Sequence, residues 1–62
     1  MPYISIEGPH LRREQKAELV REFTEAASRI MNIPREAFVV MIKENDAENV
    51  GVGGRLLADR EK

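Results

Sequence analysis

The sequence predicts an α/β fold, a single βαβ unit with parallel strands, because two short strand patterns flank one long amphipathic helix through short connections. Residues 3–7 read Tyr, Ile, Ser, Ile and Glu, the period-two alternation of a strand with one half-buried face. Gly8 and Pro9 then end the strand. We expect residues 1–62 to form one domain.

The second element is an amphipathic helix over about residues 12–31. Its apolar residues recur at intervals of three and four while charged residues occupy the other faces. Asn32 tolerates a left-handed cap and Pro34 disfavours helical geometry at Ile33, so the helix is expected to end there. Its start is poorly marked, since no Ser, Thr, Asp or Asn precedes it.

The second strand, residues 38–43, reads Phe, Val, Val, Met, Ile and Lys, a nearly continuous apolar run that indicates burial on both faces. One helix covers only one face, so we expect another subunit to cover the side that carries Val39 and Met41 or their alternates. A chain of 62 residues buries a small core, and without Cys and with one His it lacks disulfides or a structural metal site. Oligomerisation is the remaining means of stabilising so small a domain.

The chain after Glu44 is predicted to be irregular at first. Residues 45–49 are polar and loop-like, and Gly51, Gly53 and Gly54 allow a turn or short C-terminal hairpin. Residues 55–62 mix Leu56 and Leu57 with charges, so this tail could form a strand or a helical turn that docks on a neighbour.

The charge balance and the hydropathy of the sequence argue against nucleic acid and membranes as partners. Ten basic and eleven acidic residues leave a formal charge of −1, so no net field draws the chain to nucleic acid or to an anionic membrane. No signal-peptide pattern and no run of about 18 apolar residues is present. We expect a soluble, cytoplasmic protein.

Pro2 is the first candidate for chemistry. An initiator Met before a small residue is removed by aminopeptidases, which would leave Pro2 with a chain-terminal secondary amine. Such an amine titrates nearer neutrality than Lys, and an apolar or cationic pocket lowers its pKa further. It is then suited to act as a general base near pH 7. The alternative is that Pro2 only begins an edge strand, where its missing N–H is harmless.

Other candidates are weaker. The segment 51–56 lacks the third spaced glycine of a phosphate cradle. His10 is a lone loop histidine near Arg12 and Arg13, two cations that oppose the dipole at the start of a helix. Further cations able to bind a carboxylate are Arg35, Lys43 and Arg55. No carboxylate pair, metal-ligand set or Ser, His and Asp combination stands out, so no metal or other cofactor is expected.

Taken together, four features resemble the 4-oxalocrotonate tautomerase family: Met1-Pro2 before a short strand, a helix containing Glu14-Gln15-Lys16, a second strand ending at Glu44, and residues 50–54 reading Val-Gly-Val-Gly-Gly. The likeness covers essentially the whole chain. The run from Ala47 to Gly54 followed by residues 56–60 is similar to the DmpI-type branch.

This resemblance implies a cofactor-independent isomerase that moves a proton between an enol and its conjugated ketone, with Pro2 as acid and base. The substrate would be a small 2-hydroxy-dienoate or other enol acid, as in aromatic compound catabolism. It also implies a homohexamer, a trimer of dimers, in which paired βαβ units form four-stranded sheets.

The sequence departs from the family pattern at three positions. Leu11 and Val39 stand where the family has substrate-binding arginines, and Val50 stands at the pocket aromatic. We therefore expect Val39 and Val50 to line the pocket. The missing charges are expected from Arg12 or Arg13, with Arg55 of another subunit as a further candidate. The same departures leave two alternatives: another reaction of the superfamily, such as decarboxylation or dehalogenation, and a non-catalytic hexamer that binds small acids.

Overall fold

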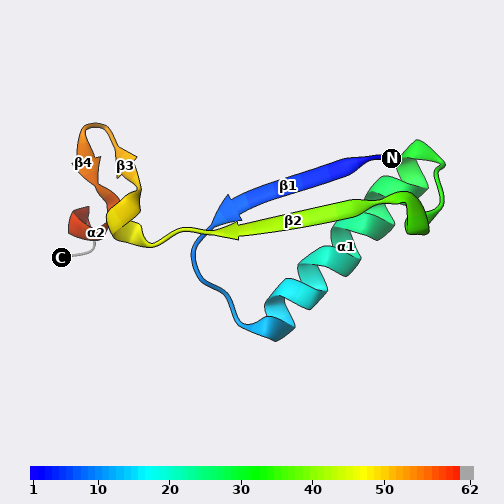
Figure 1. The fold of residues 1–62 in the computed structure, drawn as a ribbon, viewed down its shortest axis with the longest axis horizontal. Helices are drawn as coiled ribbons and strands as arrows, with labels where there is room; N and C mark the ends of the chain where they lie inside the picture. Colours follow the sequence, from blue (N-terminus) through cyan, green and yellow to red (C-terminus); the bar gives the residue numbers. More distant parts are fainter. Residues whose placement is uncertain (61–62) are drawn as a thin grey trace.

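The computed structural model describes residues 1–60 and contains a βαβ unit followed by a projecting arm (Figure 1). The βαβ unit consists of β1 (Tyr3–Gly8), α1 (Arg13–Met31) and β2 (Val39–Glu44), with the short 3-10 helix η1 (Arg35–Ala37) before β2. The arm consists of the 3-10 helix η2 (Ala47–Asn49), the hairpin strands β3 (Gly51–Val52) and β4 (Arg55–Leu56), and α2 (Leu57–Arg60).

β1 and β2 lie parallel and side by side, which confirms the predicted α/β topology. Their register pairs Tyr3 with Val39 and Ser5 with Met41. The second strand begins one residue later than expected, because the Phe38 N–H donates to the carbonyl of Arg35 and closes η1. The two strands therefore run in the same direction from the end of the molecule where the chain starts (Figure 1).

Both ends of α1 are closed by local contacts. At the start, the Arg12 N–H donates to the side-chain oxygen of Gln15 at 3.0 Å, which is the bond that a Gln at the third helical position supplies in a capping box. At the end, Asn32 takes the left-handed conformation at φ 60° and its N–H donates to Ser28 O at 2.9 Å. The predicted cap at Asn32 is confirmed.

The two faces of the β1–β2 sheet differ. Ile4, Ile6, Val40 and Ile42 are half-buried on the face toward α1. On the opposite face Tyr3 is 61% exposed and Met41 43% exposed. The expected burial of β2 on both faces is therefore absent from a single chain, because α1 covers one face only.

The arm turns through a tight hairpin and leads away from the βαβ unit (Figure 1). Gly53 and Gly54 have φ angles of 62° and 85°, and a two-residue loop with two such angles is the turn that suits twisted β-hairpins. The predicted tail alternatives both occur, since β4 is followed at once by the short helix α2. Residues 61 and 62 lie outside the described residues.

The single chain is far from spherical. Its Cα radius of gyration is 14.9 Å, whereas a compact domain of this length has about 11 Å. Among residues 1–60 no hydrophobic side chain is fully buried. Nor does any helix in this range combine the length and apolar character needed to cross a membrane.

Candidate functional site

Pro2 lies immediately before β1, at the end of the sheet near the carboxyl end of α1 (Figure 1). Its carbonyl accepts a hydrogen bond from the Val39 N–H at 3.1 Å, which extends the parallel ladder by one rung. The residue is half-buried, while Met1 before it is 94% exposed. Pro2 is thus held in place through its carbonyl, and its ring nitrogen has no part in the ladder.

The other predicted site residues fall into two groups. Val39 is next to Pro2 through the hydrogen bond just described. Arg12 and Arg13 stand at the start of α1, and Val50 and Arg55 belong to the arm, beyond the far end of β1 (Figure 1). Six residues of strand span about 20 Å, so one chain does not bring these four residues to Pro2.

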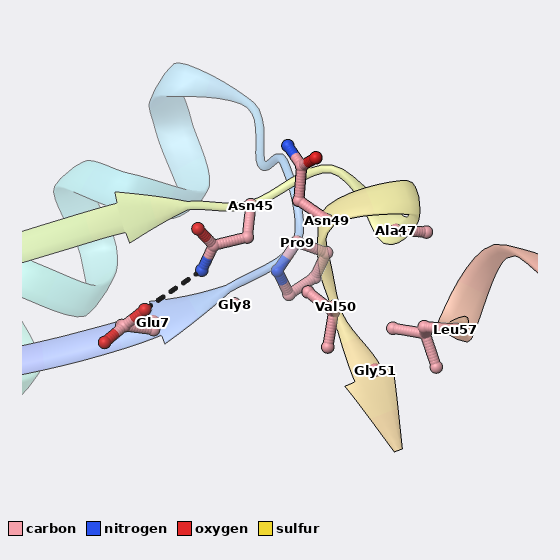
Figure 2. A pocket seen from close by; sticks show the side chains of 9 residues that line it. All are labelled: Glu7, Gly8, Pro9, Asn45, Ala47, Asn49, Val50, Gly51 and Leu57. Carbon is pink, nitrogen blue, oxygen red and sulfur yellow. Dashed lines mark hydrogen bonds between the residues drawn. The ribbon is translucent and has the colours of Figure 1, made fainter. Parts of the chain in front are cut away.

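A cleft of about 650 Å³ lies at the opposite end of the sheet from Pro2, between the end of β1 and the arm (Figure 2). Its polar side chains are Glu7, Asn45 and Asn49, and the amide of Asn45 donates to Glu7 Oε1 at 3.1 Å. The rest of its lining is Gly8, Pro9, Ala47, Val50, Gly51 and Leu57. Of the predicted site residues, Val50 alone lines it.

This cleft offers hydrogen bonding beside an apolar wall. Val50 and Leu57 supply the apolar surface, and the Leu57 N–H donates to Val50 O at 2.7 Å, which joins α2 to the residue before β3. The side-chain amides can both donate and accept hydrogen bonds, whereas Glu7 carries negative charge. Among residues 1–60, the side chains that line it include no cation.

A network of charged groups joins the loop before α1 to the end of β2. Glu44 accepts hydrogen bonds from Lys16 Nζ and from the Leu11 N–H, both at 2.9 Å. His10 Nε2 lies 2.5 Å from Asp46 Oδ1, and His10 Nδ1 lies 3.8 Å from Glu44 Oε1. The hydrogen bonds from Lys16 and Leu11, with the positive charge of Lys16 and the nearby His10, hold the pKa of the Glu44 carboxyl below its ordinary value.

Sequence reasoning missed both the lining of the cleft and this network. The sequence pattern places Glu7 in the first strand, Asn45 and Asn49 in a polar loop, and His10 as a lone loop histidine. One signal was available: parallel strands end at the same edge, so the residues after β1 and β2 must meet there. That rule brings the segment with His10 near the segment with Asp46, and the individual contacts come from the structure.

The side chains of residues 1–60 described above offer proton transfer, hydrogen bonding and ion pairing. Within residues 1–60 there is no group of three His, Cys, Asp or Glu side chains arranged to hold a metal ion. In the same part of the chain, no ion pair involves Arg12, Arg13 or Arg55, and all three are exposed. These guanidinium groups are therefore available to an external carboxylate.

Comparison with known proteins places these features in context. The family model described as tautomerase enzyme matches residues 2–60. A Campylobacter jejuni protein named "Probable tautomerase" is 38% identical over 56 residues, which cover 87% of this chain and 82% of that protein.

Two solved structures have the same fold. DmpI from Archaeoglobus fulgidus is 43% identical, with a TM-score of 0.87 over 94% of this chain and all of that chain (100%). A heterohexameric 4-oxalocrotonate tautomerase from Chloroflexus aurantiacus is 29% identical, with a TM-score of 0.79 over 94% of this chain and 92% of that chain.

Proposed function

The chain belongs to the tautomerase family and is a tautomerase-type isomerase, and on that premise we propose that Pro2, freed by removal of Met1, is its general base and acid. The resemblance inferred from the sequence is thereby confirmed. The proposed substrates are small 2-hydroxy-dienoates or other enol acids. The proposed reaction moves one proton from the enol oxygen to a carbon atom of the conjugated system.

The observation that carries this proposal is the way Pro2 is held. Its carbonyl makes the first rung with Val39, so loss of Met1 leaves that rung intact and exposes a ring nitrogen at a fixed position. While Met1 is attached, the same nitrogen belongs to a tertiary amide and has no useful basicity. The function therefore depends on one cleavage.

The ring nitrogen can serve in both steps of the reaction. A chain-terminal amine titrates near pH 8, and burial disfavours the charged form and lowers the pKa of an amine. The neutral nitrogen takes the proton of the enol hydroxyl as the carbonyl forms. The resulting ammonium then gives a proton to the carbon that the electron pair has reached, which restores the neutral amine.

We propose that the active site is completed by neighbouring subunits. The predicted substrate-binding residues lie away from Pro2 in one chain, since Arg12 and Arg13 stand at the start of α1 and Val50 and Arg55 belong to the arm. The sheet face carrying Tyr3 and Met41 is uncovered. A second copy on that face would bury apolar surface that this small chain leaves in water. The proposed assembly is a homohexamer, a trimer of dimers with four-stranded sheets; the Chloroflexus aurantiacus relative is named as a heterohexamer.

Substrate binding is proposed to use the arginines outside the family positions. Leu11, Val39 and Val50 cannot pair with a carboxylate, whereas Arg12, Arg13 and Arg55 are exposed and make no ion pair within residues 1–60. A guanidinium group binds a carboxylate through two parallel hydrogen bonds. One or more of these arginines, supplied by a neighbouring chain, would hold the acid with its enol end at Pro2.

The experiment is ketonisation of 2-hydroxymuconate and phenylenolpyruvate by protein whose intact mass shows that Met1 is absent. Pro2→Ala should lower kcat/KM by at least about 100-fold, the usual minimum contribution of a positioned acid or base. Pro34→Ala, at an exposed proline before η1, is the matched control and should retain activity. Full activity in Pro2→Ala, or in protein that retains Met1, would reject the role of Pro2.

The same assay separates catalysis from binding alone. If the processed wild-type protein binds these acids but turns none of them over, the chain is a small-acid-binding assembly. A bell-shaped dependence of kcat/KM on pH, with an acid limb that shifts in Pro2→Ala, whose terminal group is a primary instead of a secondary amine, would support the amine as the base.

A further inference from the structure

His10 lies at the point where the arm leaves the βαβ unit. It belongs to the loop between β1 and α1, and its ring nitrogen Nε2 is 2.5 Å from Oδ1 of Asp46. Asp46 is the last residue before η2, the first element of the arm. The contact therefore links the loop before α1 to the first turn of the arm.

Few other contacts hold the arm in its direction. The main element contacts of η2, β4 and α2 are with one another, so the arm packs mostly on itself. Besides His10, the root of the arm is held by the Asn45 N–H, which donates to Gly8 O at 2.8 Å, and by the Asn45 side chain on Glu7. Because the arm packs mostly on itself, the contacts at this root set the direction in which it leaves the βαβ unit.

The protonation state of His10 decides how many carboxylates it can engage. Its two nitrogens approach different acids, Asp46 at Nε2 and Glu44 at Nδ1. A neutral imidazole has one N–H and faces the other acid with a lone pair, whereas the imidazolium directs an N–H toward each. The uncharged form therefore loses the ionic part of both contacts.

The other charged groups near His10 do not remove the dependence of these two contacts on its protonation state. Lys16 on α1 faces Glu44 rather than His10 and keeps that carboxylate paired at 2.9 Å. Further charged groups of the surrounding elements are Glu7 at the end of β1, Arg12 and Arg13 after His10, Glu14 in α1, Lys43 in β2 and Glu48 in η2. Within residues 1–60 none of them makes an ion pair with the ring. Because the pKa of Glu44 is lowered, this acid stays ionised well into the acidic range and continues to face the ring.

We propose that His10 is a pH-sensitive clamp that fixes the arm: the imidazolium holds Asp46 and Glu44 together, and its deprotonation loosens the root of the arm. The inference rests on the proposed function in one respect, since the arm carries Val50 and Arg55, which are proposed to complete a neighbour's site. Because the imidazolium form makes both contacts, the clamp is tighter at lower pH.

The test is hydrogen exchange at the amides of Asn45 and Asn49, whose N–H groups donate to Gly8 O and Asp46 O at the root of the arm. Protection factors, corrected for intrinsic exchange, are compared at pH 6 and pH 8, either side of the usual histidine titration. In the wild-type protein they should be about two- to fivefold larger at pH 6, the range expected for an exposed ion pair. His10→Gln and Asp46→Asn should lower them at pH 6 and remove the difference.

Glu48→Gln is the matched control, because Glu48 is an exposed acid of η2 that makes no ion pair within residues 1–60. It should behave as the wild type. Equal protection in the wild type and His10→Gln at both pH values would overturn the proposal, as would an unchanged pH difference in Asp46→Asn.

Failure of the clamp and failure of the proposed catalysis give different results. Exchange reports the arm whether or not the protein turns over a substrate. An active Pro2→Ala variant with a normal pH difference in exchange would reject the proposed base and leave the clamp standing. A wild-type protein with Pro2-dependent activity and no pH difference in exchange would reject the clamp alone.

Discussion

Lys16 Nζ lies 2.9 Å from Glu44 Oε2, so the first turn of α1 is bound to the last residue of β2. The same carboxylate accepts the N–H of Leu11, in the loop that leads into the helix. The Glu44 side chain is only 24% exposed, so these contacts are partly shielded from solvent. Through them, Glu44 joins β2 to the loop before α1 and to α1 itself. Its position at a strand end makes it a link between the helix and the sheet.

We predict that this link makes stability depend on pH in the acidic range. The pKa of Glu44 is lowered in the folded chain below its ordinary value of 4.5, so its contribution is complete above pH 4.5 and is lost as the pH falls through the lower, folded value. Glu44→Gln should therefore be less stable than wild type near neutral pH. The difference should shrink as the solution is acidified, in urea unfolding at a fixed protein concentration.

The control for this prediction is Glu36→Gln. Glu36 is an exposed acid in η1 that makes no ion pair within residues 1–60, so its loss should change stability little at any pH. A stability difference between wild type and Glu44→Gln that does not narrow in acid would contradict the assignment.

The left-handed cap at Asn32 gives a second prediction. A residue with a Cβ is strained at φ 60°, and alanine lacks the short polar side chain that lets asparagine tolerate it. Asn32→Ala should lower the free energy of unfolding by about 1 kcal/mol, whereas Asn32→Gly should be neutral or slightly stabilising. Parallel urea unfolding of both variants measures this, and an equal loss in both would mean that the side chain, not the backbone angle, matters.

The hairpin turn gives a third prediction. Gly54 has a φ of 85°, and although a Cβ there would meet nothing within 4 Å, the backbone angle itself disfavours any other residue. Gly54→Ala should weaken the hairpin by about 1 kcal/mol and reduce the exchange protection of the arm. Gly51→Ala is the matched control in the same hairpin, since its Cβ would make an ordinary contact at 3.8 Å and its φ is not positive. Similar losses in both variants would exclude the turn as the cause.

The fold was predictable because its signals are local. The alternation of residues 3–7, the helical spacing over residues 12–31 and the cap at Asn32 each depend on neighbours in the sequence, and all three are present in the structure. The site was less predictable. His10 and Asp46 are separated by 36 positions, and no local pattern pairs them.

The placement of Pro2 shows what else about the site could not be predicted from the sequence. Its position before a strand can be read from the sequence, but its separation from the arm follows only from the direction of β1 and β2. Two strands that run in parallel carry Pro2 and Val39 to one end and Asn45 and Val50 to the other. In the proposed site these residues come from different chains. The apolar second strand predicts that a second subunit is present, but no pattern within one chain shows which subunit supplies which residue.

The uncovered sheet face allows the proposed assembly to be tested directly. Met41 is 43% exposed in the single chain, beside Ser5 of β1, so a charge there would cost little if this face remained in water. If a second subunit covers the face, Met41→Lys would bury an unpaired ammonium group and disrupt the assembly. Sedimentation velocity should then show a smaller species than wild type, with loss of the Pro2-dependent activity.

The control is Ala17→Lys, on the exposed stripe of α1 between Arg13 and Arg21, which should leave the size of the assembly and the activity unchanged. A Met41→Lys protein of wild-type size and stability would mean that this face stays open to solvent, and the source of the residues missing around Pro2 would have to lie on another surface.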